Sequence, residues 1–222
     1  MDGDVGLGDY YTHSIIRGDS DKLNVLPYLD FDYGKLFARV DTLGVKTLKM
    51  GYGYLELVGR ISQDGFSTNA SGLQGLHTRQ TSIPVGIGTF QVTPIGAFMV
   101  NAFHDVNQSQ GNMLEAIYGV ELDLPRVILY PLIGAEYQSR EYVSYYYGVS
   151  TQEAASSKYA AYQPAGSYNS LIGLIADISL TDEYHLNFCV RHKWLGDSIQ
   201  LSPIVNQRYL DTGYLSLSYR FK

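Results

Sequence analysis

The sequence predicts an all-β protein whose strands form an antiparallel transmembrane β-barrel. Apolar and polar residues alternate along many segments of about ten residues or more, which is the length of a tilted membrane strand and about twice that of an average soluble strand. Short and long connections follow one another between these segments. No run of about 18 consecutive apolar residues occurs, which excludes a transmembrane helix. A barrel fits all three observations, because half of each of its strands is polar.

Eleven segments have the alternation and the flanking turn residues of strands. Bacterial single-chain barrels have an even number of strands, so we predict twelve, with ten as the alternative if one strand has been counted as two. The undetected twelfth strand is expected within 141–168 or 195–207. Residues 1–222 are expected to form this single domain. The eleven candidates cover residues 4–15, 24–33, 35–43, 50–61, 79–90, 92–104, 112–123, 126–138, 169–180, 183–194 and 211–221.

The closing strand carries the pattern most clearly. Leucines and aromatic residues occupy one face, and small polar residues with one arginine occupy the other. A soluble β-sandwich shows the same alternation with its apolar face inward, whereas a membrane barrel turns that face to the lipid. In a barrel, Phe221 is expected to belong to the assembly signal and Arg220 to point into the lumen. The apolar face holds Leu215, Leu217, Tyr219 and Phe221, and the polar face holds Tyr214, Ser216, Ser218 and Arg220.

The lengths of the connections separate the membrane barrel from the soluble sandwich. Tight turns at 33–35, 123–125 and 181–183 contrast with connections that are long and polar. Short periplasmic turns and long external loops are typical of outer-membrane barrels, so we expect this location. The long connections are 63–78, 105–111, 138–168 and 195–210.

The composition narrows the class of partner. Tyrosine is frequent, with 20 residues, which fits aromatic girdles at two water–lipid interfaces. The formal net charge of −6 argues against nucleic acid as a partner. Cys189 is the single cysteine, so neither an intramolecular disulfide nor a cysteine-based metal site is expected. No secretory signal peptide is recognisable, and we interpret residues 1–3 as an artificial start at the point where such a signal was removed.

Charged residues of both signs fall on the faces that a barrel turns inward. They are compatible with a narrow polar channel or with a hydrolase site in the barrel. We favour a mutually neutralising network that fills a small lumen, because buried charges must be paired. The candidates are Asp30, Asp32, Arg39, Asp41, Glu56, Arg60, Arg79, Glu115, Glu121, Glu136, Arg191, Lys193 and Arg220.

The chain offers no motif for catalysis, for a cofactor or for a metal ion. Five histidines and many serines are present, but no Gly-x-Ser-x-Gly elbow occurs. His185 and Cys189 share a strand face that His192 opposes, which argues against a zinc site made of these three residues. Neither a helix nor the lysine of a phosphate-binding loop follows residues 86–88. We therefore expect a protein that is not an enzyme.

The long connection around residue 150 is expected to contain a short helix near 150–157. Ser150 or Thr151 can cap this helix, and Glu153 in its first turn fits a capping box. A helix of about two turns is not stable alone, so it must rest on the barrel mouth or in the lumen. We favour a structural plug, and the alternative is a constriction or a lid that docks a partner. The flanking tyrosines that can pack against it are Tyr145, Tyr146, Tyr147, Tyr159 and Tyr162.

Four short motifs lie in order along nearly the whole chain. They are Gly6-Leu7-Gly8 with Tyr10-Tyr11, Arg17-Gly18 and Val25-Leu26-Pro27; Tyr145-Tyr146-Tyr147-Gly148-Val149-Ser150 with Gln152-Glu153-Ala154-Ala155 and Tyr159–Tyr162; Ser202-Pro203-Ile204-Val205; and Ser218-Tyr219-Arg220-Phe221. In this order they resemble the MltA-interacting protein (MipA/OmpV) family. Two departures are Ser156-Ser157-Lys158, where the family pattern has a Ser-Gly pair, and Lys222 after the terminal phenylalanine.

The resemblance implies a barrel in the outer membrane of a Gram-negative bacterium, in contact with its lipid and lipopolysaccharide and expected to be a monomer. It also implies a scaffold that brings a lytic transglycosylase together with a bifunctional penicillin-binding protein for murein growth. Two other functions stay open, a small-solute channel and a surface adhesin that acts through the long loops. Partner contacts are expected on the periplasmic turns or on residues 139–168 and 195–210.

Overall fold

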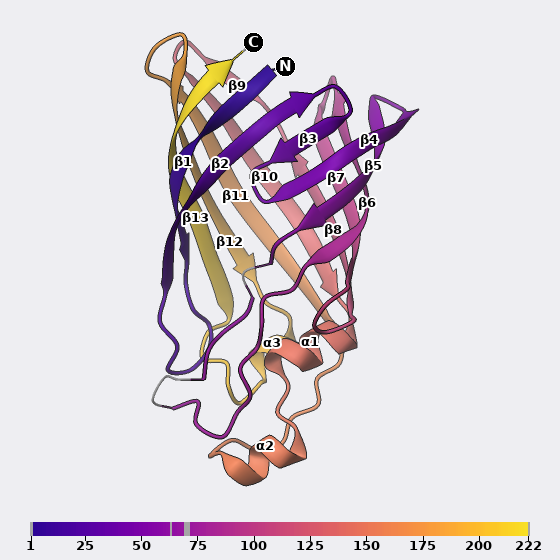
Figure 1. Cartoon of the computed structure of the whole chain (residues 1–222), viewed down its shortest axis with the longest axis vertical. Coiled ribbons are helices and arrows are strands. Elements are labelled where there is room, and N and C mark those ends of the chain that lie inside the picture. The colour runs from indigo at the N-terminus through magenta and orange to yellow at the C-terminus, as the bar shows by residue number, and fades with distance from the viewer. Residues whose placement is uncertain (1, 63, 69–71, 222) are drawn as a thin grey trace.

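The protein is a closed antiparallel β-barrel with its two termini at the same end (Figure 1). The computed structural model describes residues 2–62, 64–68 and 72–221. Neighbouring strands pair in chain order, and β1 (Asp2–Thr12) closes the wall by pairing with β13 (Tyr209–Phe221). The other strands are β2 (Lys22–Tyr33), β3 (Leu36–Arg39), β4 (Thr42–Met50), β5 (Gly53–Arg60), β6 (Pro84–Thr93), β7 (Gly96–Asp105), β8 (Asn112–Gly119), β9 (Leu122–Leu124), β10 (Val127–Gln138), β11 (Ser167–Ser179) and β12 (Tyr184–Trp194).

The segments β8 and β9 are two parts of one wall strand. Both pair with β10, Gly119 opposite Leu132 and Leu122 opposite Leu129, and only residues 120–121 separate them. The thirteen segments of the described chain therefore make twelve wall strands. This confirms the predicted twelve-stranded antiparallel barrel.

The strand missed in the sequence is β4, which lies in neither of the two ranges where the twelfth strand is expected. The pairing of β4 with β5 shifts register between Lys46 and Lys49. Such an irregularity moves the following side chains to the other face and destroys the alternation. The candidate segments 35–43 and 50–61 therefore absorbed the start and the end of β4.

Two strand starts also differ from the prediction. β6 begins at Pro84 rather than at 79, and β7 begins at Gly96 rather than at 92. Pro94 lies in the turn between them, where its missing N–H costs no ladder hydrogen bond, and Gly96 adopts a φ of +131° that favours glycine. The connection before β6 therefore spans residues 61–83.

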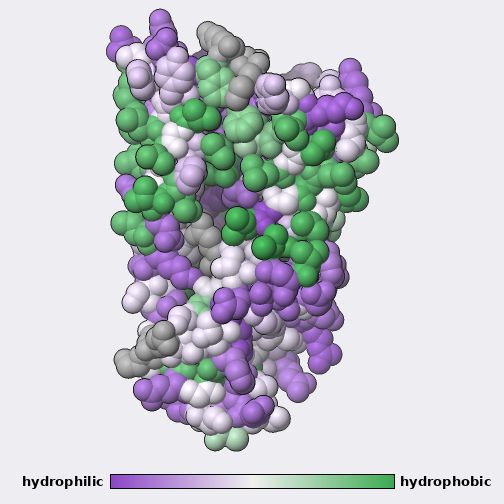
Figure 2. All heavy atoms as spheres, viewed as in Figure 1, coloured by the Kyte–Doolittle hydropathy of each residue, from purple (hydrophilic) through white to green (hydrophobic). Residues whose placement is uncertain are grey.

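The outward face of the wall is apolar between two aromatic rims. On β13, Leu215 and Leu217 are exposed on the outside, and the alternate residues are buried inside. Tyr184 and Tyr219 pack together at the end of the tight turns, with 5.7 Å between their ring centroids. Figure 2 shows the hydrophobic band between hydrophilic ends. This arrangement is typical of a wall that contacts lipid.

The long connections fold together at the end opposite the termini (Figure 1). They contain α1 (Arg140–Tyr147), α2 (Thr151–Ser156) and α3 (Asp197–Gln200). The helix predicted near 150–157 is α2, whereas α1 and α3 are not among the predicted elements. We call the described parts of residues 61–83, together with 139–166 and 195–208, the loop lid.

In the described part of the chain, none of the helices is long and apolar enough to cross a membrane.

The largest apolar core of the described residues joins the loop lid to the barrel mouth. Its most deeply buried members come from α1, from α3 and from the loops that follow β5 and precede β13. Full burial of one large apolar side chain contributes about 1.5–3 kcal/mol, so this core holds short helices that are unstable alone. The side chains with no accessible surface are Leu73, Tyr142, Val143, Tyr146, Ile199 and Ile204.

Candidate functional site

Two arginine–carboxylate pairs join wall strands on the lumen side of the barrel. Arg39 of β3 donates two hydrogen bonds to Glu56 of β5, at 2.8 and 2.7 Å. Arg60 of β5 donates two to Glu115 of β8, at 3.2 and 2.9 Å. Both carboxylates are buried, so each needs its partner to offset the loss of water. These pairs tie wall strands together from the inside.

A second group of charges lies toward the termini. Arg220 of β13 donates to Asp4 of β1, at 2.7 Å for both oxygens, and to Asp177 of β11 at 2.6 Å. His185 of β12 lies 2.7 Å from the other oxygen of Asp177. Four neighbouring strands thus contribute to one network around the closing strand.

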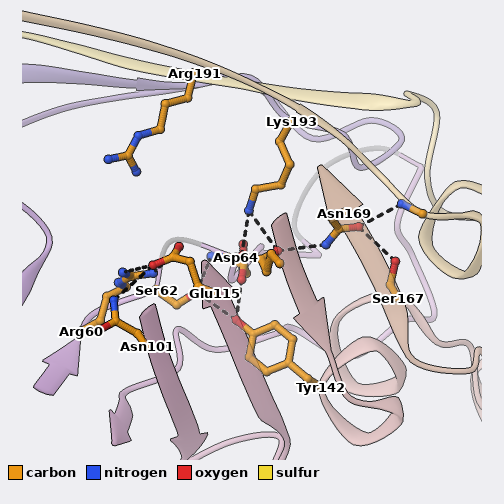
Figure 3. Close-up of polar contacts among 12 residues, drawn as sticks. Arg60, Ser62, Asp64, Asn101, Glu115, Tyr142, Ser167, Asn169, Arg191 and Lys193 are labelled. Carbon is orange, nitrogen blue, oxygen red and sulfur yellow. Dashed lines mark hydrogen bonds and ion pairs between the residues drawn. The ribbon is translucent and has the colours of Figure 1, made fainter. Parts of the chain in front are cut away.

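A third group lies directly under the loop lid (Figure 3). Lys193 of β12 contacts both oxygens of Glu136 at 3.1 Å, and Asn169 donates to the same carboxylate at 2.9 Å. The Tyr142 hydroxyl of α1 donates to Asp64 at 2.5 Å. The Gly196 N–H of the loop lid donates to the side-chain oxygen of Asn169 at 2.9 Å, so a polar contact joins the lid to the lumen face of the wall in addition to the apolar core.

The remaining predicted lumen charges have other surroundings. Asp32 pairs with Lys46 at 2.8 Å and is half exposed. Asp30 lies opposite Arg39 in the strand register and is exposed to the lumen. Glu121 is exposed at the break between β8 and β9. Arg79 is not in the wall and belongs to the loop lid, because β6 starts after it.

The turn between β3 and β4 folds into the lumen. Val40 adopts a φ of +56°, a conformation that a β-branched residue rarely takes and that costs about 1–3 kcal/mol. Its side chain packs against the aromatic cluster around Tyr28 and Tyr214. Asp41 then lies between β5 and β12. Its carboxylate is 3.8 Å from the Arg60 guanidinium and 4.0 Å from the Arg191 guanidinium.

The five predicted lid tyrosines meet in the loop lid. Tyr146 and Tyr147 are buried in its core, and Tyr145 packs against them from the side. The Tyr159 hydroxyl donates to the Gly72 carbonyl at 2.8 Å, and the Tyr162 hydroxyl donates to the Ser198 carbonyl at 3.0 Å. The tyrosines therefore join the loop of α1 and α2 to both of the other lid segments.

One buried ion pair fixes α2. The Ser150 hydroxyl accepts from the Glu153 N–H, and the Glu153 carboxylate accepts from the Ser150 N–H, which completes a capping box. The same carboxylate accepts from the His77 N–H at 3.0 Å and from Arg79 at 2.7 Å. Burial raises the pKa of Glu153, but these N–H donors outweigh burial and lower the pKa to about 2.

Some lid residues carry weak signals in the sequence. Two examples are Tyr142 of α1, whose hydroxyl donates to Asp64, and Ile199 of α3. Neither belongs to a recognisable hydrophobic period, because α1 has only eight residues and α3 only four. The Ser-Pro-Ile-Val motif was a usable signal. Its Ser202 hydroxyl donates to the Tyr147 carbonyl at 2.6 Å, and its Ile204 and Val205 are buried in the lid core.

Within residues 2–62, 64–68 and 72–221, no three His, Cys, Asp or Glu side chains converge in a way that could hold a metal ion.

Several known proteins similar to this chain are named as outer membrane proteins. The sequence profile described as MltA-interacting protein MipA matches residues 5–221. YiaT of Escherichia coli (strain K12) is 23% identical over 98% of this chain and 90% of its own length. Outer membrane protein OmpV of Vibrio cholerae is 27% identical over 62% of this chain and 54% of its own, and the MltA-interacting protein of Escherichia coli (strain K12) is 24% identical over 68% and 60%. With its closed twelve-stranded wall, the chain is an outer-membrane β-barrel of a Gram-negative bacterium and belongs to the MltA-interacting protein (MipA) family.

Proposed function

We propose that this barrel is a non-enzymatic interaction protein whose partner-binding surface lies on its periplasmic turns. One observation carries the proposal: paired charges fill the lumen, and the loop lid covers its outer mouth. Porins, by contrast, keep a wide aqueous channel. A barrel closed in this way acts through its surfaces rather than through its lumen.

The periplasmic end presents exposed side chains that suit a protein partner. Short turns and both termini face the periplasm in outer-membrane barrels. Tyr52, between β4 and β5, is 69% exposed, and Ile95, between β6 and β7, is 71% exposed. Large aromatic and apolar side chains on projecting turns are the type of residue that dominates protein interfaces.

The proposed partner is a lytic transglycosylase. A relative is named MltA-interacting protein, and murein, on which such an enzyme acts, lies on the periplasmic side of this membrane. The family resemblance adds a bifunctional penicillin-binding protein as a second partner. The barrel then holds a murein-cleaving and a murein-building enzyme close together at the outer membrane.

Retention of a purified lytic transglycosylase on the immobilised full chain tests this proposal. The double variant Tyr52→Ser, Ile95→Ser should retain it about tenfold less well or worse, because loss of interface hot spots costs at least about 2 kcal/mol. The matched control is Leu201→Ser in the loop lid, where Leu201 is 71% exposed, and it should change nothing. Equal retention by the turn variant, or no retention by the unaltered chain, contradicts the proposal.

Planar-bilayer recording tests the closed lumen separately. The unaltered protein should give no regular conductance steps, because the lid and the ion pairs obstruct the lumen. Regular steps would contradict the closed lumen and favour the small-solute channel.

A further inference from the structure

The barrel wall is incomplete beside β2. This strand pairs with β1 from Lys22 to Asp32, but it pairs with the four-residue β3 only from Asp30 to Tyr33. In the part of the chain that the structure describes, no strand pairs with the same edge of β2 between residues 22 and 28. More than half of β2 therefore borders a break in the wall.

Four segments frame this break, which we call the wall window. The Val40–Asp41 turn borders it toward the periplasm, where the Val40 N–H donates to the Leu29 carbonyl at 2.7 Å. The Lys22 ammonium borders it toward the loop lid by donating to the Gly65 carbonyl. Residues 22–28 of β2 form one side, and the end of β5 forms the other (Figure 1). Figure 2 shows a hollow here, with hydrophobic side chains on both sides and hydrophilic ones deep inside.

The margins of the wall window are apolar and exposed. Leu26 belongs to the inward face of β2, yet it is 39% exposed, which fits a position beside an opening. The outward side chains lie in the apolar band of the wall, where they contact lipid chains. These exposed outward residues are Leu23, Val25, Leu43, Leu57 and Ile61.

A cation with few charged partners faces the lumen beside Asp41, at the edge of the wall window. Figure 3 shows the Arg191 side chain extending into the lumen without a drawn contact. Among the described residues, the Arg191 Nε is buried without a hydrogen-bond partner, and the carboxylate nearest to its guanidinium is Asp41, at 4.0 Å. Arg60, in contrast, has two hydrogen bonds to Glu115. An arginine fork normally takes a carboxylate in bidentate geometry at about 2.7–2.9 Å, whereas Arg191 contacts the Cys189 thiol and has no such carboxylate among the described residues.

Asp41 is the loosely held counter-ion of this arginine. It is 43% exposed, and its closest arginine contacts, at 3.8 and 4.0 Å, are longer than hydrogen bonds. It accepts a hydrogen bond from the neighbouring Thr42 hydroxyl, at 2.9 Å. Asp41 follows the strained Val40 in a turn at the edge of the wall window. Since Asp41 is the carboxylate nearest to Arg191, it occupies the place that an entering anion needs.

We propose that the wall window is a binding site for a long-chain fatty acid from the surrounding membrane. The acyl chain lies along the apolar margins, and the carboxylate takes the place of Asp41 at Arg191. A carboxylate with a single acyl chain matches two features of the site. The Arg191 guanidinium lacks a bidentate carboxylate, and the exposed side chains that line the way to it are apolar.

Strand addition by a peptide is disfavoured at the same edge. Because the Leu29 carbonyl points toward β3, alternate residues of β2 present their backbone groups to the wall window. One of them is Pro27, which has no N–H to donate, and proline at such a position blunts an edge against pairing. This leaves a lipid as the better occupant.

Native mass spectrometry of the full chain, released from detergent after titration with palmitate, tests the site. The unaltered protein should bind one palmitate and should bind methyl palmitate much more weakly. Arg191→Gln should weaken palmitate binding about tenfold or more, because hydrogen bonds to a charged group are lost. Asp41→Asn should tighten it about threefold or more, because the competing negative charge is gone.

The matched control is Asp32→Asn, which removes the same charge on β2 beyond the Val40–Asp41 turn, outside the wall window, and should leave palmitate binding unchanged. Leu26→Trp should weaken binding by narrowing the opening. No palmitate adduct, equal binding of the methyl ester, or equal affinity of the Asp41→Asn and Asp32→Asn variants would each overturn the proposal. Heat-modifiable migration on a gel checks folding, and if Arg191→Gln fails it, the Asp41 and ester comparisons still decide.

Discussion

At the loop end of the barrel, Tyr142, Tyr146 and Ile199 are fully buried in an apolar core, whereas at the turn end Asp30 is exposed and the Arg220 side chain is 29% exposed. Both ends contain ion pairs, but their surroundings differ. The pair of Glu153 with Arg79 lies inside packed side chains, and the pairs of Arg220 remain within reach of lumen water. Removal of one partner of an ion pair should therefore lower the free energy of unfolding more at the loop end than at the turn end.

This contrast has a structural cause. Tight turns leave no chain at the periplasmic end to build a second layer, so charges there are neutralised across neighbouring strands. The long loops supply enough chain to form a small core of their own on top of the barrel mouth. We expect this core to keep the loop end closed while the wall below it stands independently.

The largest expected effect comes from the buried ion pair of the lid. Glu153→Gln keeps the shape of the side chain but leaves the charge of Arg79 buried and unpaired, and such a break costs about 3–5 kcal/mol. Hydrogen exchange should show the loss in α1 and α2 while the wall strands keep their protection. An equal loss of protection in β12 and β13 would mean that the lid and the wall unfold as one unit.

Acid should weaken the same contact without a substitution. The pKa of Glu153 is lowered from 4.5 to about 2, so its carboxylate stabilises the lid fully above about pH 4.5. That stabilisation is lost as the pH falls from about 4.5 through about 2. Protease cleavage within residues 139–166 should therefore rise over this range, and Glu153→Gln should show a flat profile there.

The lid core itself should come next. Ile199→Ala removes a side chain with no accessible surface and should cost about 2–5 kcal/mol. Hydrogen exchange in α3 and α1 measures the effect. Leu217→Ala on the exposed outer wall is the control and should leave lid protection unchanged. A similar loss in both variants would contradict a separate lid core.

The wall could be predicted from the sequence because its chemistry repeats every two residues. The alternation of Leu215 and Leu217 with Ser216 and Ser218 is visible directly, and the burial of the same residues follows it. β4 could not be predicted, because the register shift near Lys46 breaks that period. Periodicity locates a strand only while its pairing is regular.

The lid is harder to predict, because its elements depend on contacts between distant segments. The capping box of Ser150 and Glu153 is a local sequence signal that predicts the start of α2. By contrast, α1 is a run of tyrosines whose burial against Leu73 and Ile199 has no local signal. The ion pair with Arg79 also joins residues 74 positions apart, which no spacing rule reveals.

The smallest effects should come from the turn end, and two variants there sharpen the comparison. Arg220→Gln removes charged hydrogen bonds to the buried Asp4 and Asp177 and should cost about 1–3 kcal/mol, because the Arg220 side chain is 29% exposed and water can enter where its guanidinium stood. Asp32→Asn breaks the pair with Lys46, in which the Asp32 side chain is 54% exposed, and should cost less than about 1 kcal/mol. Urea unfolding, monitored by heat-modifiable migration on a gel, measures the loss of stability in both variants. Added salt should reduce the stability difference between Asp32→Asn and the unaltered chain. If Arg220→Gln lost as much stability as Glu153→Gln, the ion pairs at the turn end would be as inaccessible to water as those in the lid. The two ends would then differ only in the length of their connections.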